Sequence, residues 1–442
     1  MRGWWWVGVG LLLCARAAAA AECDTAGPAH PEWIFCHDFE APDASDFNTY
    51  WNDVYGVPER VFIIEDNPAG IAGGHAMRTQ AVNDGDSELA SGVSSGPKKF
   101  LGREVDYDAV YYRKYVRFNE GFDQGNFMHL GGLGACAPSD YPWDCMGHSG
   151  ERPAGDDRFS SNLEPWSAYQ SLEPPGRWGF YSYYHQMHMD CGHPGPDDCY
   201  GDMFAPDEDV LISRGDWHVL EMMIQPNTPG QADGYQSFWV DGVRAYTSPG
   251  INWRSDESLR INKAGIYLYV HHVPAHTECI LDFDNVVISR AYIGPSRCQP
   301  DTPIAAPCLC GGQPDPDDAS HVHSAGYCCA GSWQPTPCSQ ADGGSDGEGD
   351  GGADAGTDDG DGGDGGADAG TDGGDGAADA AGDSGSADPD AGPTDPDAAG
   401  PSRVEGSCAC SNPAGPAAPI ASWLLLLLAC RRTRRRATDT GT

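Results

Sequence analysis

Tyrosine and histidine are concentrated in one short stretch of the chain. Tyr181, Tyr183 and His185 occur at alternate positions there, and His188 and His193 follow. If this stretch is a strand, the first three side chains share one face. Phenol and imidazole groups placed together can transfer protons as acid and base, which is the chemistry of β-elimination in a uronic-acid polymer. Two alternatives remain: a tyrosine-rich core strand with histidines in a loop, and a metal site, although the histidine spacing is not a standard zinc pattern.

Aromatic and basic residues also alternate in the segment 110–118. Tyr111, Arg113, Tyr115 and Arg117 would lie on one face of a strand, and the even-numbered residues on the other. Aromatic rings stack on sugar rings, and guanidinium groups hold carboxylates through paired hydrogen bonds. We therefore interpret the odd-numbered face as a sugar-binding surface. The alternative is a solvated strand face with ordinary cross-strand pairs.

The elements that must position these residues are short strands separated by turns. Glycine and proline recur throughout residues 30–297, and no long helical periodicity is present. This pattern predicts an all-β sandwich or jelly roll. Asp241-Gly242 follows an apolar run and predicts a tight hairpin turn. The expected strands cover residues 60–64, 110–118, 127–130, 180–184, 217–224, 235–240, 265–270 and 279–289.

Cysteines indicate an oxidising compartment. The chain has 17 Cys, and most lie in close pairs or in a dense island between residues 298 and 340. Disulfides are the favoured interpretation, because zinc sites need tight paired spacings that this chain lacks. Six cysteines in the island suit three bridges, whereas Cys279 has no obvious local partner. The expected local pairs are Cys23 with Cys36, Cys136 with Cys145, and Cys191 with Cys199.

Both ends of the chain carry the features of targeting signals. Residues 1–21 combine an early arginine, an apolar stretch and small residues, which predicts a secretory signal peptide. Residues 341–407 are rich in Asp, Gly and Ala, and the part 341–400 has 18 acidic and no basic residues. Such a tract cannot bury apolar area, so we expect a disordered stalk. The formal net charge of −40 argues against nucleic acid as a partner.

The segment 408–442 contains Cys408 and Cys410, a short apolar run and an arginine cluster. This order of parts resembles the C-terminal sorting signal of myxobacterial surface proteins. The resemblance implies that export and C-terminal sorting machinery act on the chain. It also implies a secreted protein tethered to the bacterial cell surface through its processed C-terminus.

Several short motifs in residues 22–297 carry a second resemblance. They are Tyr112-Arg113-Lys114-Tyr115-Val116-Arg117-Phe118, Gly131-Gly132-Leu133, Phe159-Ser160, Tyr181-Ser182-Tyr183, Trp239-Val240-Asp241-Gly242 and Asp282-Phe283-Asp284-Asn285. In this order they resemble the fourteenth family of polysaccharide lyases, the alginate lyases. They are also similar to the fungal cellulose-induced secreted protein and its glucuronan-lyase relatives. The resemblance implies a concanavalin-like β-jelly roll that binds substrate on a concave sheet.

The family resemblance also nominates catalytic residues. Tyr181 and Tyr183 match its paired catalytic tyrosines, and Ser160 matches its site serine. His129 falls where the family has a lysine, and Asn162 falls where it has an arginine. Tyr181 and Tyr183 would then be base and acid.

Arg113 and His129 are the expected groups that neutralise the substrate carboxylate. A different lyase family has motifs similar to Gln186-Met187-His188 and Lys263-Ala264-Gly265-Ile266-Tyr267, which nominates His188 and Tyr267 as an alternative acid–base pair. The expected substrate-binding residues are Tyr111, Tyr115, Arg117, His185, His188 and Tyr267.

The leading hypothesis is a surface-attached lyase that cleaves a uronate polymer such as alginate or glucuronan. The rival hypothesis is a non-catalytic carbohydrate-binding or adhesion module on the same fold. We predict no metal site and no cofactor, and a structural calcium ion is left open. The expected organisation is a jelly roll over residues 22–297, followed by a small disulfide-rich module over 298–340.

Overall fold

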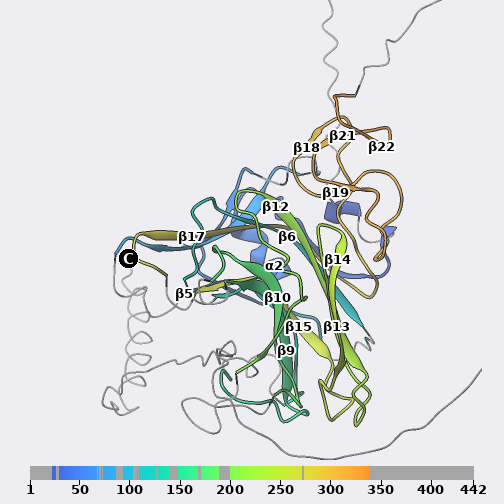
Figure 1. Cartoon of the computed structure of the whole chain (residues 1–442). Coiled ribbons are helices and arrows are strands. Elements are labelled where there is room, and N and C mark those ends of the chain that lie inside the picture. Colours follow the sequence, from blue (N-terminus) through green and yellow to red (C-terminus); the bar gives the residue numbers. More distant parts are fainter. Residues whose placement is uncertain are drawn as a thin grey trace, which may run out of the picture. The chain divides into compact units, whose positions relative to one another are not determined.

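The computed structural model describes residues 22–25, 29–66, 68, 71, 73–85, 93–102, 107, 109–125, 128–139, 145, 148–167, 171–188, 200–270 and 273–338 (Figure 1). The expected signal peptide, acidic stalk and sorting tail lie outside these residues, as does the expected Cys191–Cys199 pair. Within the described residues, no helix has the length and apolar character that crossing a membrane would require.

The first of two large sheets contains eight strands among the described residues. Its pairs are antiparallel, and β6 lies in its middle between β12 and β17. In spatial order the strands are β14 (Val243–Ile251), β13 (Gly234–Val240), β12 (Trp217–Gln225), β6 (Val110–Phe118), β17 (Thr277–Ser289), β4 (Ala76–Asn83) and β3 (Val61–Ile64), and β1 (Trp33–His37) also pairs with β17.

The second sheet contains nine strands of the described chain and is also antiparallel. In spatial order they are β11 (Asp202–Phe204), β10 (Arg177–Tyr183), β9 (Arg158–Trp166), β8 (Gly132–Cys136), β15 (Ile261–Gly265), β5 (Val93–Phe100), β16 (Leu268–Val270) and β7 (Met128–His129), and β2 (Asp53–Tyr55) also pairs with β5. The strands β8 to β11 are consecutive in the sequence, whereas β15, β5, β16 and β7 come from distant parts of the chain.

One apolar core fills the space between the two sheets. Tyr112 and Val116 of β6 enter it from the first sheet, and Phe159, Leu163 and Phe180 enter it from the second. Each of these side chains is almost completely buried. Alternate residues of β9 and β10 point away from the core, as strand geometry requires. The two packed antiparallel sheets confirm the predicted all-β jelly roll.

A hairpin turn links β13 to β14 at the predicted place. Asp241 and Gly242 both have positive φ, 53° and 79°. Two consecutive residues of this kind are the signature of a type I′ turn, whose twist matches that of the strands it joins. The helical elements are short: η1 (Glu22–Thr25), η2 (Ala44–Asp46) and α2 (Phe47–Tyr50).

Residues 298–338 form a small disulfide-rich unit, here called the C-terminal module, that packs against the first sheet. Cys298 and Cys308 share a buried cluster with Tyr115 of β6 and with Trp217 and Val219 of β12. The bridges Cys298–Cys308, Cys310–Cys328 and Cys329–Cys338 confirm the predicted number of three. Its short strands are β18 (Pro303–Ile304), β19 (Cys308–Leu309), β20 (Val322–His323), β21 (Gly326–Cys329) and β22 (Ser332–Gln334).

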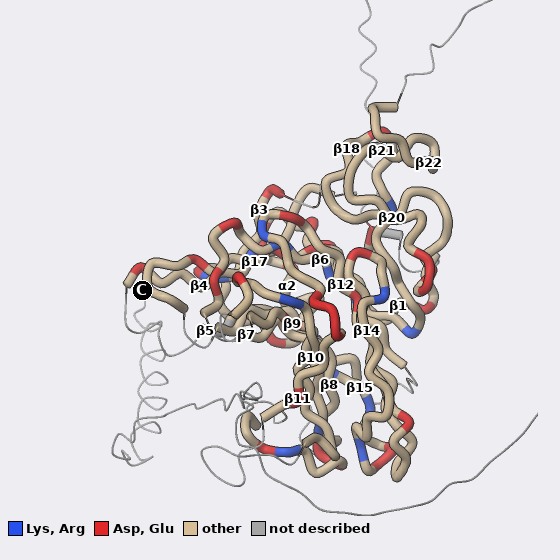
Figure 2. Tube along the Cα trace, in the orientation of Figure 1, with Lys and Arg blue, Asp and Glu red and all other residues tan. Residues whose placement is uncertain are grey.

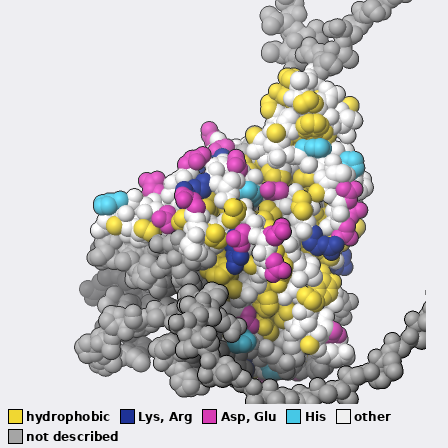
Figure 3. All heavy atoms as spheres, viewed as in Figure 1, with side chains coloured by type: hydrophobic (Ala, Val, Ile, Leu, Met, Phe, Trp, Pro, Cys, Tyr) yellow, Lys and Arg dark blue, Asp and Glu magenta, His cyan; other side chains and the backbone are white. Residues whose placement is uncertain are grey.

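Two further disulfides confirm predicted pairs. Cys23 bonds to Cys36, and Cys136 bonds to Cys145. Cys279 is a buried free cysteine. On the side of the molecule seen in Figure 3, acidic and apolar side chains are interspersed, and apolar side chains gather on the C-terminal module, where Trp333 is 43% exposed.

Candidate functional site

The candidate site lies on the outer face of the second sheet, the face that points away from the core. Adjacent strands place Tyr183 beside Ser160, and Tyr181 beside Asn162. On its other side, β9 pairs with β8, where Gly132 lies opposite Asn162. Four of the residues predicted to be catalytic are therefore neighbours on β9 and β10.

The two tyrosines of β10 are in direct contact. Their hydroxyl oxygens are 3.2 Å apart, and their rings meet edge to face with centroids 5.5 Å apart. The backbone N–H of Gly201 donates to the Tyr181 hydroxyl at 3.1 Å. Burial, and then the neighbouring Tyr183, raises the pKa of Tyr181 well above that of an ordinary phenol. Tyr181 therefore keeps its proton, which suits a proton donor and not the base that the family resemblance implied for it.

His129 of β7 completes this group. Its ring stacks on Tyr181 with centroids 5.3 Å apart and on Tyr269 with centroids 5.7 Å apart. Its Nδ1 donates to the carboxylate of Glu164 at 2.9 Å. When a carboxylate accepts from Nδ1–H, the lone pair lies on Nε2, the arrangement that lets an imidazole act as a base.

Glu164 holds the imidazole from a position inside the protein. It follows Asn162 by two residues on β9, so both belong to the same strand face, and only 1% of Glu164 is exposed. Burial raises its pKa, and the nearby His129 and Lys114 act in the opposite direction. A carboxylate removed from solvent binds its partner more strongly than an exposed one.

Tyr267 packs against the backbone of two glycines, Gly96 and Gly265. A Cβ added to Gly265 would be 3.3 Å from the Tyr267 ring, and one added to Gly96 would be 2.8 Å from the Tyr267 Cβ. Gly96 also has a φ of 142°, which disfavours other residues. Tyr267 is hydrogen-bonded to Asn162, and burial raises its pKa. The structure thus joins Tyr267 to the β9 residues of the site.

Basic residues lie on the strands beside these groups, and Figure 2 marks Lys and Arg positions in blue on the chain trace near β8 and β15. Gly134 of β8 lies between Lys263 of β15 and Ser160 of β9. A Cβ added at Gly134 would be 3.2 Å from Lys263 Cε and 3.5 Å from Ser160 Cβ, so both side chains border the same glycine. Burial, followed by Lys98 and Arg158, lowers the pKa of Lys263 to about 8. Lys98 Nζ lies 4.7 Å from the Tyr55 ring centre and 3.5 Å from Asp53. Lys263 and Lys98 thus place two ammonium groups on the neighbouring strands β15 and β5, and the Lys98 ammonium is paired with Asp53.

The prediction that Arg113 neutralises a substrate at this site is wrong. Arg113 lies on β6 of the first sheet, is 1% exposed, and points away from the core under the segment that leads into the C-terminal module. Its guanidinium donates to Glu22 at 2.5 and 3.0 Å and to the carbonyl oxygens of Asn285 and Gly294. Every contact is internal, so Arg113 is a structural residue.

The rest of the predicted sugar-binding face of β6 is covered too. Tyr115 donates its hydroxyl to the carbonyl of Pro307 at 2.7 Å. Arg117 pairs with Asp282 at 2.7 Å. The Tyr111 ring packs against the rings of Trp239 and Tyr292. The alternation along this strand was predicted correctly, but its odd-numbered side chains are held by contacts within the protein, with Tyr115 fully buried and Tyr111 and Arg117 partly buried.

The predicted histidines near the end of β10 are placed differently from expectation. β10 ends at Tyr183, so His185 does not continue its strand face. The His185 backbone N–H donates to the carbonyl of Trp253 at 3.2 Å. His188 is exposed, and its backbone N–H donates to Asp202 at 3.0 Å.

The predicted site residues did not include Glu164, Tyr269, Lys98 or Lys263. Lys263 could have been predicted from the sequence, because it begins the motif that nominated Tyr267. Glu164 had no local signal, since an isolated glutamate on a strand is usually solvated. Its role depends on His129, 35 residues away in the chain.

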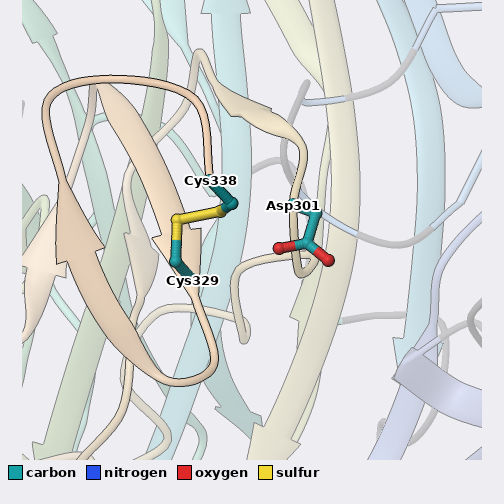
Figure 4. Close-up of side chains that lie close together, drawn as sticks. All are labelled: Asp301, Cys329 and Cys338. Atoms are coloured by element: carbon teal, nitrogen blue, oxygen red, sulfur yellow. A yellow bond between two sulfur atoms is a disulfide. The ribbon is translucent and has the colours of Figure 1, made fainter. Parts of the chain in front are cut away.

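Metal-ligating side chains come together at one place among the described residues, shown in Figure 4. Asp301 lies close to Cys329 and Cys338. The two cysteines are bonded to each other, so neither sulfur is a thiolate that could bind a metal ion. This grouping is part of the C-terminal module's disulfide framework.

No protein-family model matches the chain, and no curated protein matches it in sequence. Solved structures that are similar to it include a marine PL-14 alginate lyase from Aplysia kurodai, with 16% identity, a TM-score of 0.45, and coverage of 60% of this chain and 99% of that chain. The endo-β-1,4-glucuronan lyase from the fungus Trichoderma reesei has 15% identity, a TM-score of 0.39, and coverage of 58% and 95%. The cellulose-induced protein Cip1 has 13% identity, a TM-score of 0.31, and coverage of 57% and 98%. These are the kinds of protein that the sequence motifs resemble, and the likeness concerns the fold.

Proposed function

We propose that the protein cleaves a uronate-containing polysaccharide by β-elimination on the outer face of the second sheet. The observation that supports this most strongly is the contact between an imidazole oriented by a buried carboxylate and a pair of hydrogen-bonded phenols. His129 and Tyr181 stack with ring centroids 5.3 Å apart, and the Tyr181 and Tyr183 hydroxyls are 3.2 Å apart. A base and an acid therefore lie next to each other on one surface.

The base in this proposal is His129. Its Nε2 removes the proton from the carbon next to the uronate carboxylate, and the electron pair of that C–H bond forms the new C=C bond. The side chain of His129 is 20% exposed, so a bound chain can reach it, while that of Glu164 behind it is 2% exposed. Glu164 stabilises the imidazolium that forms.

The acid is Tyr183, supported by Tyr181. As the bond between sugar carbon and leaving oxygen breaks, that oxygen takes the phenolic proton of Tyr183. Tyr183 is the more exposed of the pair, and the Tyr181 hydroxyl, 3.2 Å away, can donate a hydrogen bond to the phenolate left behind. The raised pKa of Tyr181 keeps that donor protonated.

Lys263 and Lys98 attract the substrate in this scheme. An ammonium near the uronate carboxylate withdraws charge and makes the neighbouring C–H more acidic. Asn162 and Ser160 lie between these lysines and the tyrosines and can donate hydrogen bonds to the same carboxylate. This assignment gives the neutralising role to β15 and β5 in place of Arg113.

We also propose that the protein is exported and held at the bacterial cell surface by its C-terminal segment. The five described disulfides fit an oxidising compartment. Surface labelling of intact cells, compared with a chain truncated before Cys408, tests this. Equal labelling of both proteins would contradict the proposed tether.

The lyase proposal is tested by incubating the purified protein with alginate and with glucuronan. Elimination creates a conjugated double bond, so ultraviolet absorbance should rise with wild type and not with His129→Ala. Binding of either polymer without product would instead support the non-catalytic adhesion module. Neither binding nor product, across a range of salt and pH, would reject both.

A further inference from the structure

A lysine from the opposite sheet lies beneath the candidate site. Lys114 belongs to β6, points into the core, and is 1% exposed. Its Nζ donates to the carbonyl oxygens of Leu130 and Gly131, both at 3.1 Å. These two residues connect His129 at the end of β7 to Gly132 at the start of β8. The backbone that carries the imidazole is therefore tied to the first sheet by one side chain.

Lys114 also belongs to the charge system of the site. Glu164 of β9 is the charged group that acts on it from a facing element, and Glu164 in turn accepts a hydrogen bond from His129. Lys114 Nζ lies 5.3 Å from the centre of the Tyr112 ring on the same strand. The charge of Glu164 also acts on Tyr267, where it contributes to the raised pKa of that phenol. An ammonium, a carboxylate and an imidazole thus come from three different strands, β6, β9 and β7.

Burying the Lys114 ammonium costs free energy, which suggests that the residue has a role beyond filling space. A methionine would fill similar space without removing a charge from water. With methionine, however, the Leu130 and Gly131 carbonyls would lose a donor, and the buried Glu164 would lose its positive neighbour. Both losses would change the support of His129, through the backbone of Leu130 and Gly131 and through the carboxylate of Glu164.

We propose that Lys114 is a positioning residue for the elimination: it anchors the segment that carries His129 and balances the carboxylate that orients the imidazole. This inference rests on the proposed function. It extends that function by giving a residue of the core, Lys114, a part in the reaction. Lys114 touches no substrate in this scheme. It acts through Leu130, Gly131 and Glu164.

The charge of the Lys114 ammonium should change near neutral pH, so its contribution to the site should depend on pH. Burial lowers the pKa of Lys114 to about 7, while Glu164 acts to raise it. Below that pH the ammonium balances the Glu164 carboxylate. Above it, the Glu164 carboxylate loses this balancing charge.

The first test replaces Lys114 with methionine in the full chain. Lys114→Met should lower kcat by about 10- to 100-fold with little change in KM, and should remove the rate change near neutral pH that the titrating lysine causes. Lys99→Met is the matched control, because Lys99 Nζ also donates to a backbone carbonyl, that of Tyr50, away from the site. Lys99→Met should keep both kcat and the pH profile. Unchanged kcat and pH profile in Lys114→Met would overturn the proposal.

The second test needs no activity, so it separates this inference from the lyase proposal. In wild type, the side-chain carbon signal of Lys114 in a nuclear magnetic resonance titration should change near pH 7. In Glu164→Gln the midpoint should move to lower pH, because the attractive charge is gone. A midpoint that does not move would overturn the coupling, even in a protein that proves inactive or when Lys114→Met fails to fold. A moving midpoint in a protein without lyase activity would reject the proposed function and leave the charge network intact.

Discussion

Glu164, with only 1% of its surface exposed, accepts a hydrogen bond from His129 Nδ1 at 2.9 Å. The carboxylate comes from β9 and the imidazole from β7, at opposite parts of the second sheet's strand order, yet the side chains meet. Because the carboxylate is shielded from water, it orients the ring and favours one tautomer. The relationship makes His129 the best-prepared base among the described residues of the site.

Replacing that carboxylate should lower catalysis without abolishing substrate binding. We expect Glu164→Gln to reduce kcat by about 10- to 100-fold, because an amide orients the ring less firmly and cannot stabilise an imidazolium. Initial rates of unsaturated product formation measure this. A variant with full kcat would show that Glu164 has no part in orienting a base.

The two tyrosines should respond differently to loss of their hydroxyls. Tyr183→Phe should reduce kcat by about 100-fold or more, because it removes the proposed proton donor. Tyr181→Phe should have a smaller effect, because its hydroxyl only supports that donor. Tyr246→Phe, on β14 of the first sheet, is the control and should be as active as wild type. The reverse order of effects for the two site tyrosines would exchange their assigned roles.

Arg113 should prove structural. Arg113→Met should destabilise the protein by about 3 kcal/mol or more, because it removes the charged partner of Glu22 and the Arg113 donors to two backbone carbonyls. The fraction that stays folded should retain the wild-type kcat. Chemical unfolding and activity per folded molecule measure the two effects. Adding Glu22→Gln should recover part of the lost stability, and a large fall in kcat would return Arg113 to the site.

Binding of an acidic polymer should weaken as pH rises past that at which Lys263 loses its charge. The pKa of Lys263 is lowered to about 8, so its attraction for a carboxylate is present below pH 8 and lost above it. Lys263→Met should bind alginate about fivefold more weakly near neutral pH and should lack this decline. Arg244→Met, on the first sheet, should behave like wild type. Calorimetric titration at several pH values distinguishes these outcomes.

Glu221 should make stability depend on pH. Its carboxylate accepts from the backbone N–H groups of Ile293 and Gly294, yet burial raises its pKa from 4.5 to about 7. Between these values the folded protein keeps a proton that the unfolded chain has released. The stabilisation is therefore full below pH 4.5 and is lost as pH rises through 7, by an amount on the order of 3 kcal/mol.

The test compares Glu221→Gln with wild type by chemical unfolding across this range. The variant should lack the decline, because glutamine does not titrate. Lys114 adds a dependence of opposite sign above pH 7, but it is common to both proteins and cancels in the comparison. Glu173→Gln, whose wild-type side chain is 87% exposed, should show the wild-type decline. Parallel curves for Glu221→Gln and wild type would contradict the prediction.

Local sequence determined a large part of this protein. Alternation in the segment 110–118 predicted β6 at its observed bounds, and Asp241-Gly242 predicted the turn between β13 and β14. Close spacing predicted the Cys23–Cys36 and Cys136–Cys145 bridges. Each of these features depends on residues near one another in the chain, so backbone geometry and short loops settle it.

Tertiary structure alone decided which strand face became a site. A period of two groups Arg113 with Tyr115 but does not say what covers them, and here residues 291–310 and the N-terminal segment do. The same period sends Lys114 into the core, where a charge is unexpected. His129, Glu164 and Lys114 meet because the strand order of two sheets joins distant segments, and contacts of that kind leave no periodic trace in the sequence.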